Sequence, residues 1–374
     1  MEVKAIIVLV ILLESVTILL FMSRGKWQEK SPSIPFIYDE ECACRKDLSS
    51  CEKWYGILNH EEWHVDLSKP KKTIKLRVVD SWEPDPTNEK PWCYICNYLS
   101  RVYKLDFSGE PDFVFYSVFG KKHLNYKNCV KILFSGENYI PNFNKCDYAI
   151  TLNDIDVYGR HFKFSQFIGK KMLYGPLNAT RNFGKNMTKR KFCNFIYFNN
   201  KKDLEGVRAR ERFFQLLSEY KHVDSPGKVF NNMENAIEPR NGRWEPGKME
   251  FIKDYKFTIA FENTNSYGYT SEKLPDALFA HSVPIYFGNP NVGLEYNKKA
   301  FIHANDYDSL EDVVKKVIEL DNDDDAYLAM LNEPPLLHPE YNHEEELTKF
   351  LTRIVERGNK PFSKDPRGFM KNSQ

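Results

Sequence analysis

The stretch FTIAFENTNSYGYTSEKLPDALFAHSVPIYFGNP, residues 257–290, decides the fold of this chain. Its apolar run at 257–262 predicts a buried strand, the segment from about 271 to 280 predicts a helix, and the run at 283–288 predicts the next strand. This order is that of a βαβ unit, in which a helix connects two parallel strands. Ligands of open α/β sheets bind outside the carboxyl ends of the strands, so the loop before the helix is a candidate ligand site.

Three side chains of this loop and of the first helical turn can bind a ligand: Tyr269, Glu272 and Lys273. Lys273 can neutralise a phosphate oxygen, Glu272 can accept hydrogen bonds from sugar hydroxyls, and Tyr269 can do either or pack against a ring. A purely structural alternative is that Ser271 caps the helix and Glu272 interacts favourably with the helix dipole. That alternative does not explain Lys273, because a cation at a helix N-terminus is unfavourable unless an anion accompanies it.

Strand and helix signals of the same kind continue upstream of this unit. Further strands are expected at 72–79, 112–119, 129–135 and 192–198, and a further helix at 204–220. The alternation predicts an α/β fold with parallel strands. It is interrupted by a loop-rich region at 170–190, after which it restarts, so we expect a domain boundary there. Two domains also suit the length of 374 residues, which is about twice the usual domain size.

The helix expected at 204–220 supplies a second cation near an apolar surface. Arg210 shares one helix face with Phe213, Phe214 and Leu217 through the i, i+3, i+4 and i+7 spacing. An arginine on an apolar stripe must find an anion, and its planar guanidinium suits a phosphate or a carboxylate. Two alternatives stay open at this stage: a bound phosphate, or an internal pair with a core Asp or Glu.

The charge balance limits the class of partner. Basic and acidic residues nearly cancel, at a formal net charge of +1, so the sequence provides no broad basic face for a nucleic acid backbone. We therefore expect no nucleic acid partner.

The N-terminal segment AIIVLVILLESVTILLFM, residues 5–22, is apolar except at three positions. As a helix rising ~1.5 Å per residue it would span roughly 27 Å, enough for a thin bilayer. A cleaved secretory signal is the alternative, but the run is long for one and no small-x-small cleavage site follows it. We predict an uncleaved signal-anchor. The basic residues after the span outnumber the single one before it, which on the positive-inside rule argues against a lumenal C-terminal part.

Two other features favour a lumenal catalytic part. Asn178 and Asn186 each begin a glycosylation sequon in a polar segment that we expect to be a loop. All eight cysteines fall between Cys42 and Cys193, and an even number in a membrane-tethered chain fits disulfides in an oxidising lumen, although the connectivity stays open.

Zinc is the competing interpretation of the cysteines. Cys93 and Cys96 have the spacing of zinc ligands, C-x-x-C. No second pair with matching spacing lies nearby, so we expect no zinc site.

The motifs taken in order resemble the α1,3-fucosyltransferases of glycosyltransferase family 10. Within 257–290, a Phe-Glu-Asn, a Tyr-x-x-Glu-Lys and a Val-Pro-x-x-x-Gly-x-Pro follow one another as in the donor-site signature of that family. The resemblance continues upstream in FCNFIYFNN at 192–200, in the stretch 210–232 and in ILFSGENYIPNFNKCDYAI at 132–150. It covers roughly residues 72–305.

The resemblance implies a GT-B type fold, in which two Rossmann-like domains face each other across a cleft. The first domain would bind mainly the acceptor and the second GDP-fucose. The donor-binding residues that it implies are Arg210 and Lys273 for the diphosphate, and Asn263, Tyr269 and Glu272 for the nucleotide and fucose. Glu137, just past the strand expected at 129–135, falls on the proposed general base of the family.

The implied reaction is an inverting transfer of L-fucose from GDP-β-L-fucose to a hydroxyl, expected to be O3, of N-acetylglucosamine in glycoprotein or glycolipid glycans. Arg210, Lys273 and the helix dipole would stabilise the departing diphosphate. We expect no obligatory metal ion, because these groups can do the electrostatic work of a metal; Mn²⁺ is left open as a stimulating ion. The triplets at 154–156 and 306–308 match Asp-x-Asp formally, but such triplets often arise by chance.

The expected organisation is a type II single-pass protein of the Golgi membrane whose catalytic part is lumenal. Its expected segments are a cytoplasmic tail at 1–4, the transmembrane signal-anchor at 5–22, a stem at 23–70, the acceptor-binding domain at 71–190, the GDP-fucose-binding domain at 191–335 and a C-terminal helical tail at 336–374. The expected partners are GDP-fucose, a glycan containing N-acetylglucosamine, and the lipid bilayer.

Two alternative functions stay open at this stage. One is a GT-B transferase that uses another nucleotide sugar, and the other is a membrane-tethered glycan-binding protein that has lost catalysis. The acceptor glycan and the linkage, to O3, to O4 or to a core residue, are also open, because acceptor loops vary freely while a donor site keeps its chemistry.

Overall fold

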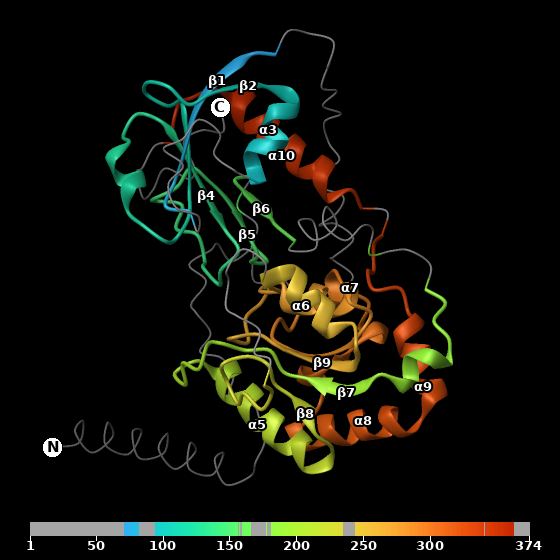
Figure 1. Ribbon diagram of the computed structural model, residues 1–374. Coiled ribbons are helices and arrows are strands. Elements are labelled where there is room, and N and C mark those ends of the chain that lie inside the picture. Colours follow the sequence, from blue (N-terminus) through green and yellow to red (C-terminus); the bar gives the residue numbers. More distant parts are fainter. Residues whose placement is uncertain are drawn as a thin grey trace, which may run out of the picture.

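The computed structural model describes residues 71–81, 94–155, 157, 159–165, 177, 181–234, 244–339 and 341–362. Figure 1 shows two α/β layers, one above the other, with helices packed against each sheet. Within each of the two sheets, every pair of neighbouring strands is parallel, as the alternating sequence pattern predicts.

The first sheet has six strands in the order β2-β1-β3-β4-β5-β6. Their bounds are β1 Thr73–Val79, β2 Lys104–Asp106, β3 Phe113–Tyr116, β4 Val130–Ser135, β5 Tyr148–Thr151 and β6 His161–Lys163. The strands expected at 72–79, 112–119 and 129–135 are confirmed as β1, β3 and β4.

The second sheet has five strands in the order β11-β10-β9-β7-β8. Their bounds are β7 Lys191–Asn194, β8 Val223–Asp224, β9 Tyr255–Phe261, β10 Val283–Phe287 and β11 Ile302–His303. β9 and β10 are buried at every position, which is why they appear in the sequence as continuous apolar runs. The strand expected at 192–198 ends early, at Asn194.

Helices cover both sheets. Their bounds are α3 Tyr94–Val102, α5 Glu205–Tyr220, α6 Trp244–Ile252, α7 Lys273–Phe279, α8 Leu310–Asn322, α9 Asp324–Asn332 and α10 His343–Arg357. The helix expected at 204–220 is confirmed as α5.

The last helix, α10, returns to the first sheet. Figure 1 shows it, in red, beside α3, in cyan, far from the other C-terminal helices α8 and α9. Leu347, Leu351 and Ile354 of α10 lie in one buried cluster with Ile95 and Leu99 of α3. Residues that sequence analysis treated as a tail therefore complete the hydrophobic core of the first domain.

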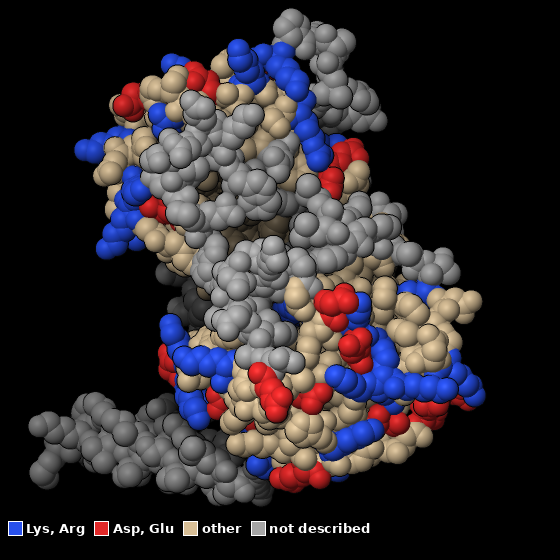
Figure 2. Space-filling view, viewed as in Figure 1, with Lys and Arg blue, Asp and Glu red and all other residues tan. Residues whose placement is uncertain are grey.

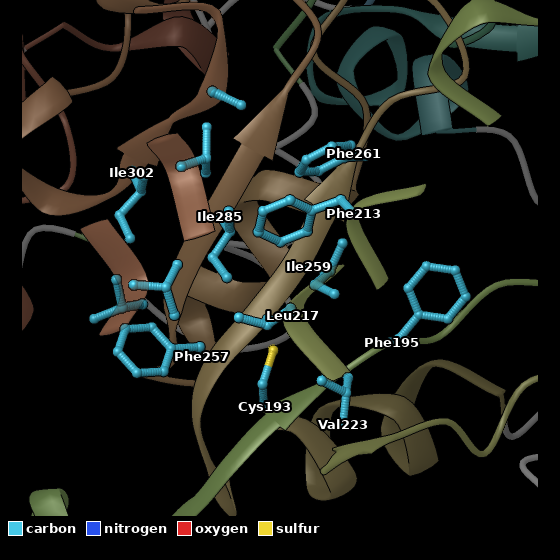
Figure 3. Close-up of a cluster of buried hydrophobic side chains, with 14 of the residues drawn as sticks. Cys193, Phe195, Phe213, Leu217, Val223, Phe257, Ile259, Phe261, Ile285 and Ile302 are labelled. Carbon is cyan, nitrogen blue, oxygen red and sulfur yellow. The ribbon is translucent and has the colours of Figure 1, made fainter. Parts of the chain in front are cut away.

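The core of the second domain lies between β9 and α5. Figure 3 shows Phe213 of α5 next to Phe261 of β9, and their ring centroids are 5.1 Å apart in a stacked pair. Leu217, one turn further along α5, is fully buried in the same cluster. The apolar face predicted for this helix is thus the face that holds it on the sheet, and it fixes where Arg210 points.

Two of the eight cysteines, Cys146 and Cys193, differ from the disulfide prediction. No disulfide joins any of the cysteines among the described residues, and Cys146 and Cys193 are buried thiols. Figure 3 shows the sulfur of Cys193 among apolar side chains of the second core. Burial raises the pKa of the Cys193 thiol, so it stays protonated and acts as a small hydrophobic side chain. The even number of cysteines suggested disulfides, but Cys146 and Cys193 are packed as thiols in buried hydrophobic clusters.

Several predictions fall outside the described residues: the anchor at 5–22, the stem at 23–70, Asn178 and Cys93. Within the described residues, no helix is both long and apolar enough to cross a bilayer. Asn186 is exposed, but it lies in the short 3-10 helix Lys185–Lys189 rather than in a loop. On the face shown in Figure 2, basic and acidic side chains are interspersed over the second domain.

Candidate functional site

The candidate site is built on Glu262, the residue that follows β9. Its side chain is fully buried, and its carboxylate accepts hydrogen bonds from the Ser271 backbone N–H at 2.7 Å, the Ser271 hydroxyl at 2.7 Å and the Lys273 ammonium at 3.1 Å. A Cβ at Gly288 would lie 2.5 Å from Cγ of Glu262, so the neighbouring β10 loop leaves room for this carboxylate only because it has a glycine there. Glu262 is the anion that the cation at 273 requires.

Lys273 is held as a cation. Burial disfavours its charge, but Glu262 and Glu272 outweigh that effect and raise the pKa of the ammonium well above its usual value. The Glu272 carboxylate lies 3.5 Å from the ammonium, and its side chain is 43% exposed, whereas that of Lys273 is 16% exposed. Glu272 can therefore move into solvent when a ligand approaches, while Glu262 cannot.

The start of the helix differs from the structural alternative of sequence analysis. Ser271 does not cap it, because its hydroxyl and its N–H both bond to Glu262. α7 begins only at Lys273. Glu272 stands at the N-cap position, but its side chain does not form a capping hydrogen bond. With seven residues, α7 has a small dipole, so the expected role of the helix dipole in binding a diphosphate is not supported. The side-chain cations remain as the candidate groups for binding an anion.

Arg210 is fully buried beside the end of β9. Its Nη1 donates to Oδ1 of Asn263 at 2.8 Å, its Nη2 donates to the Asn199 carbonyl, and its guanidinium carbon lies 4.1 Å from the ring centroid of Tyr197. Nε has no hydrogen-bond partner. The internal ion pair left open by the sequence is absent, since Arg210 forms no ion pair with a carboxylate of the described residues. An arginine satisfied only by neutral acceptors keeps its positive charge available to an anion.

The two cations converge on Tyr197. Both Arg210 and Lys273 lower the pKa of the Tyr197 hydroxyl, although burial outweighs them and raises it to about 12. The same hydroxyl accepts from the Phe261 N–H at 2.7 Å, which ties it to the end of β9. Asn263, which orients Arg210, is two residues further along the chain. Three of the predicted donor residues thus lie at one edge of the second sheet: Arg210, Asn263 and Lys273.

Tyr269 differs from the expectation of a ring that faces a ligand crevice. It is 3% exposed and packs in the buried cluster of the first domain, with Leu152 and Phe164. Burial raises the pKa of its hydroxyl, which lies within electrostatic range of Lys273, Glu262, Glu272 and Glu137. The ring is therefore an anchor between the domains, and only the hydroxyl end lies near the candidate site.

Gly268, the residue before Tyr269, is in close contact with the backbone of the first domain. Its φ is +80°, and a Cβ would lie 2.2 Å from the backbone nitrogen of Asp154. The loop after β9 in the second domain therefore docks on the chain just past β5 in the first domain, in an approach that only glycine allows.

Replacing Gly268 with Ala is expected to force this loop away from Asp154. Strain at positive φ and contact with backbone together are expected to lower the free energy of unfolding by about 2 kcal/mol and to reduce activity. Thermal unfolding and initial rates measure both effects. Gly247→Ala is the matched control, because no atom lies within 4 Å of that Cβ and the position is helical, so it should be neutral or stabilising. Equal stability of the two variants would contradict the close docking.

Glu137 approaches the same loop from the first domain. It is exposed, two residues after β4, and it lies within electrostatic range of the Tyr269 hydroxyl. The next residue, Asn138, donates from Nδ2 to the Thr264 hydroxyl at 2.8 Å and accepts at Oδ1 from the Ser266 hydroxyl at 3.3 Å. These bonds hold the segment that carries Glu137 against the segment between β9 and α7. The Glu137 carboxylate thus lies near the loop that leads to Lys273.

Sequence analysis missed three residues of this arrangement. Glu262 could have been suspected, because an acid directly after a fully buried strand needs a partner. Tyr197 and Asn138 had no comparable signal, since their roles depend on contacts across the sheet and across the two domains.

One carboxylate of each Asp-x-Asp triplet is engaged in an ion pair with a lysine. Asp154 pairs with Lys163 at 2.5 Å, and Asp306 pairs with Lys298 at 2.6 Å. Within the described residues, no group of three or more His, Cys, Asp or Glu side chains is placed to hold a metal ion.

Comparisons with known proteins identify the family of both domains. Residues 76–169 match the family model "Alpha-(1,3)-fucosyltransferase FucT N-terminal domain", and residues 186–333 match "Glycosyltransferase family 10 (fucosyltransferase) C-term". The alpha-(1,3)-fucosyltransferase FucT of Helicobacter pylori is 28% identical over 307 residues, which are 72% of this chain and 62% of that relative. The chain thus spans less than two thirds of the length of this relative.

Solved structures share the fold. An alpha1,3-fucosyltransferase with GDP matches with a TM-score of 0.62 at 23% identity, over 80% of this chain and 95% of that one. An alpha1,3-fucosyltransferase with GDP-fucose matches with a TM-score of 0.62 at 24% identity, over 81% of this chain and 95% of that one. At this identity, the likeness establishes the architecture of two facing α/β domains.

Proposed function

Because the chain belongs to glycosyltransferase family 10, whose N-terminal and C-terminal domain models together match more than half of it, we propose that it is an α1,3-fucosyltransferase. The reaction moves L-fucose from GDP-β-L-fucose to a hydroxyl, O3 by expectation, of N-acetylglucosamine in a glycan. The observation that carries the proposal is the pair of hydrogen bonds that Asn138 makes, one donated to Thr264 and one accepted from Ser266, which hold the Glu137 segment against the loop that leads from β9 to Lys273.

In this reaction, Glu137 is the general base. Its carboxylate takes the proton of the acceptor hydroxyl while the hydroxyl oxygen bonds to the anomeric carbon of fucose. The bond from that carbon to the diphosphate breaks with its electron pair on the GDP oxygen, so the configuration inverts in a single step. An exposed carboxylate suits this role, because it can come within about 2.6–3.2 Å of an incoming hydroxyl.

Arg210 and Lys273 stabilise the negative charge that develops on the departing diphosphate. Electrostatic stabilisation by groups already in place often contributes the largest part of catalysis. Arg210 is preorganised by Asn263 and Tyr197, and Lys273 by Glu262. Glu272, released from Lys273, accepts hydrogen bonds from fucose hydroxyls, and Asn263, which accepts from Arg210, contacts the nucleotide sugar.

The proposal is tested by incubating the protein with GDP-fucose and a panel of lactosamine and N-glycan acceptors, and by mapping the linkage of each product. Transfer to O3 of N-acetylglucosamine is expected. Parallel reactions with UDP-linked and other GDP-linked sugars are the control for donor choice. Turnover of one of those donors, with GDP-fucose left intact, would overturn the proposal.

No step of this mechanism requires a metal ion, and Mn²⁺ is proposed only as a stimulating ion that screens the leaving diphosphate. Transfer is therefore expected to keep at least about half of its rate in excess chelator, because fixed cations neutralise the leaving group. Initial rates with EDTA, and with Mn²⁺ added back, measure this. Complete loss in EDTA that added metal restores would contradict it.

A further inference from the structure

Four of the six residues from Thr264 to Tyr269 contact the first domain. Thr264 and Ser266 bond to Asn138, Gly268 lies against the backbone at Asp154, and the Tyr269 ring is part of the first core. The Gly268 N–H also donates to Oδ1 of Asn289 at 2.8 Å, which ties the segment to its own domain as well. The backbone on both sides of position 267 is therefore held in place.

Tyr267 differs from these four residues. Its side chain is 59% exposed, which makes it the most exposed of the large hydrophobic residues among those that the structure describes. The neighbouring tyrosine, Tyr269, is 3% exposed. An exposed aromatic ring on a fixed backbone loses little entropy when it is covered by a ligand, so it is a favourable binding group.

The position of Tyr267 indicates what covers it. Ser266, the residue before it, bonds to Asn138, the residue after Glu137, so the ring and the proposed base lie on adjoining segments. The cations proposed for the diphosphate lie on the helices of the second domain, Arg210 on α5 and Lys273 at the start of α7, and neither bonds to Asn138. Tyr267 therefore belongs to the side on which the acceptor approaches, although it comes from the donor-binding domain.

We propose that Tyr267 is an acceptor-binding residue whose ring stacks on the C–H face of a pyranose ring of the glycan and whose hydroxyl bonds to a sugar hydroxyl. This inference rests on the proposed function for the position of the acceptor. A sugar ring has an apolar face and a polar rim, and tyrosine has the same combination of an apolar body and a polar end. The contact holds the sugar so that its reacting hydroxyl meets Glu137.

The test compares Tyr267→Ala and Tyr267→Phe with the wild-type protein. Tyr267→Ala is expected to raise the acceptor KM about 10-fold or more, the effect of losing one well-packed aromatic contact. Tyr267→Phe keeps the stacking surface and should recover most of the affinity. The KM for GDP-fucose and the rate of GDP-fucose hydrolysis without acceptor should stay within twofold of wild type, because the donor side is untouched.

The matched control is Tyr220→Ala. Tyr220 is also partly exposed and in the second domain, but it ends α5, and a helix that follows a strand ends at the edge of the sheet away from the ligand. Its loss should leave the acceptor KM unchanged. An acceptor KM for Tyr267→Ala that equals that of wild type would overturn the inference.

Failure of the proposed function would be distinguishable. If the wild-type protein transfers no fucose, direct titration of the same glycans into the GDP-bound protein still measures the contact. Glycan binding that Tyr267→Ala weakens and Tyr220→Ala does not would then support the tyrosine site without the reaction. Glycan binding that neither variant changes would overturn it.

Discussion

Glu137→Gln is expected to lower the rate of fucose transfer by about 10²–10⁴-fold, the contribution typical of a positioned general base. Glutamine has the size of glutamate but cannot accept the proton of the acceptor hydroxyl. Because Glu137 is exposed and its segment is held by Asn138, the substitution should leave the fold intact. The affinity for GDP should also stay the same, since no cation of the diphosphate site bonds to Glu137 within the described residues.

Single-turnover rates and calorimetric titration with GDP separate these two effects. The matched control is Glu110→Gln, an exposed carboxylate of the same domain that precedes β3 and so lies at the opposite edge of the sheet. Its transfer rate should equal that of wild type. Transfer by Glu137→Gln at more than a tenth of the wild-type rate would remove Glu137 from the role of base.

The second large effect is expected at Lys273. Lys273→Ala should weaken GDP binding by about 100-fold, in the range expected when one partner of a buried charge pair is lost. It should also destabilise the fold by about 3–5 kcal/mol, because Glu262 is left fully buried without its cation. Measured alone, weaker binding by this variant could therefore result from partial unfolding.

A double variant separates the two effects. Lys273→Met combined with Glu262→Gln removes both charges and keeps both side chains close in size, and the amide can still accept from Ser271. Its stability should return toward that of wild type, whereas the affinity for GDP should remain low. Thermal unfolding and calorimetry measure both quantities. Recovery of GDP affinity in the double variant would show that Lys273 acts only as the partner of Glu262.

Sequence patterns predicted the parts of the structure that local periodicity controls. The strands β9 and β10 are confirmed because a continuous apolar run matches a strand that is buried on both faces. The helix α5 is confirmed because its apolar residues recur with the spacing of one helix face. The positions of Arg210 and Lys273 at the edge of the second sheet follow from the βαβ order.

Other features depend on contacts between distant segments, and the sequence alone does not specify them. The burial of Tyr269 in the other domain requires the close approach of Gly268 to Asp154, which no periodicity encodes. The cysteine count suggested disulfides, but Cys193 occupies a core position for which any small apolar side chain would serve. The sequence predicted that the anion paired with Lys273 is a bound ligand. The structure shows that the Glu262 carboxylate is also such an anion.

The return of α10 to the first sheet has a consequence for biosynthesis. Leu347, Phe350 and Ile354 leave the ribosome after the whole of the second sheet, yet the first core contains them. The first domain therefore cannot complete its core until the second domain has been synthesised. Until then, the apolar side of α3 stays uncovered. The order of synthesis makes the second domain the earlier one to mature, and a nascent chain halted before residue 343 would expose a surface that chaperones recognise.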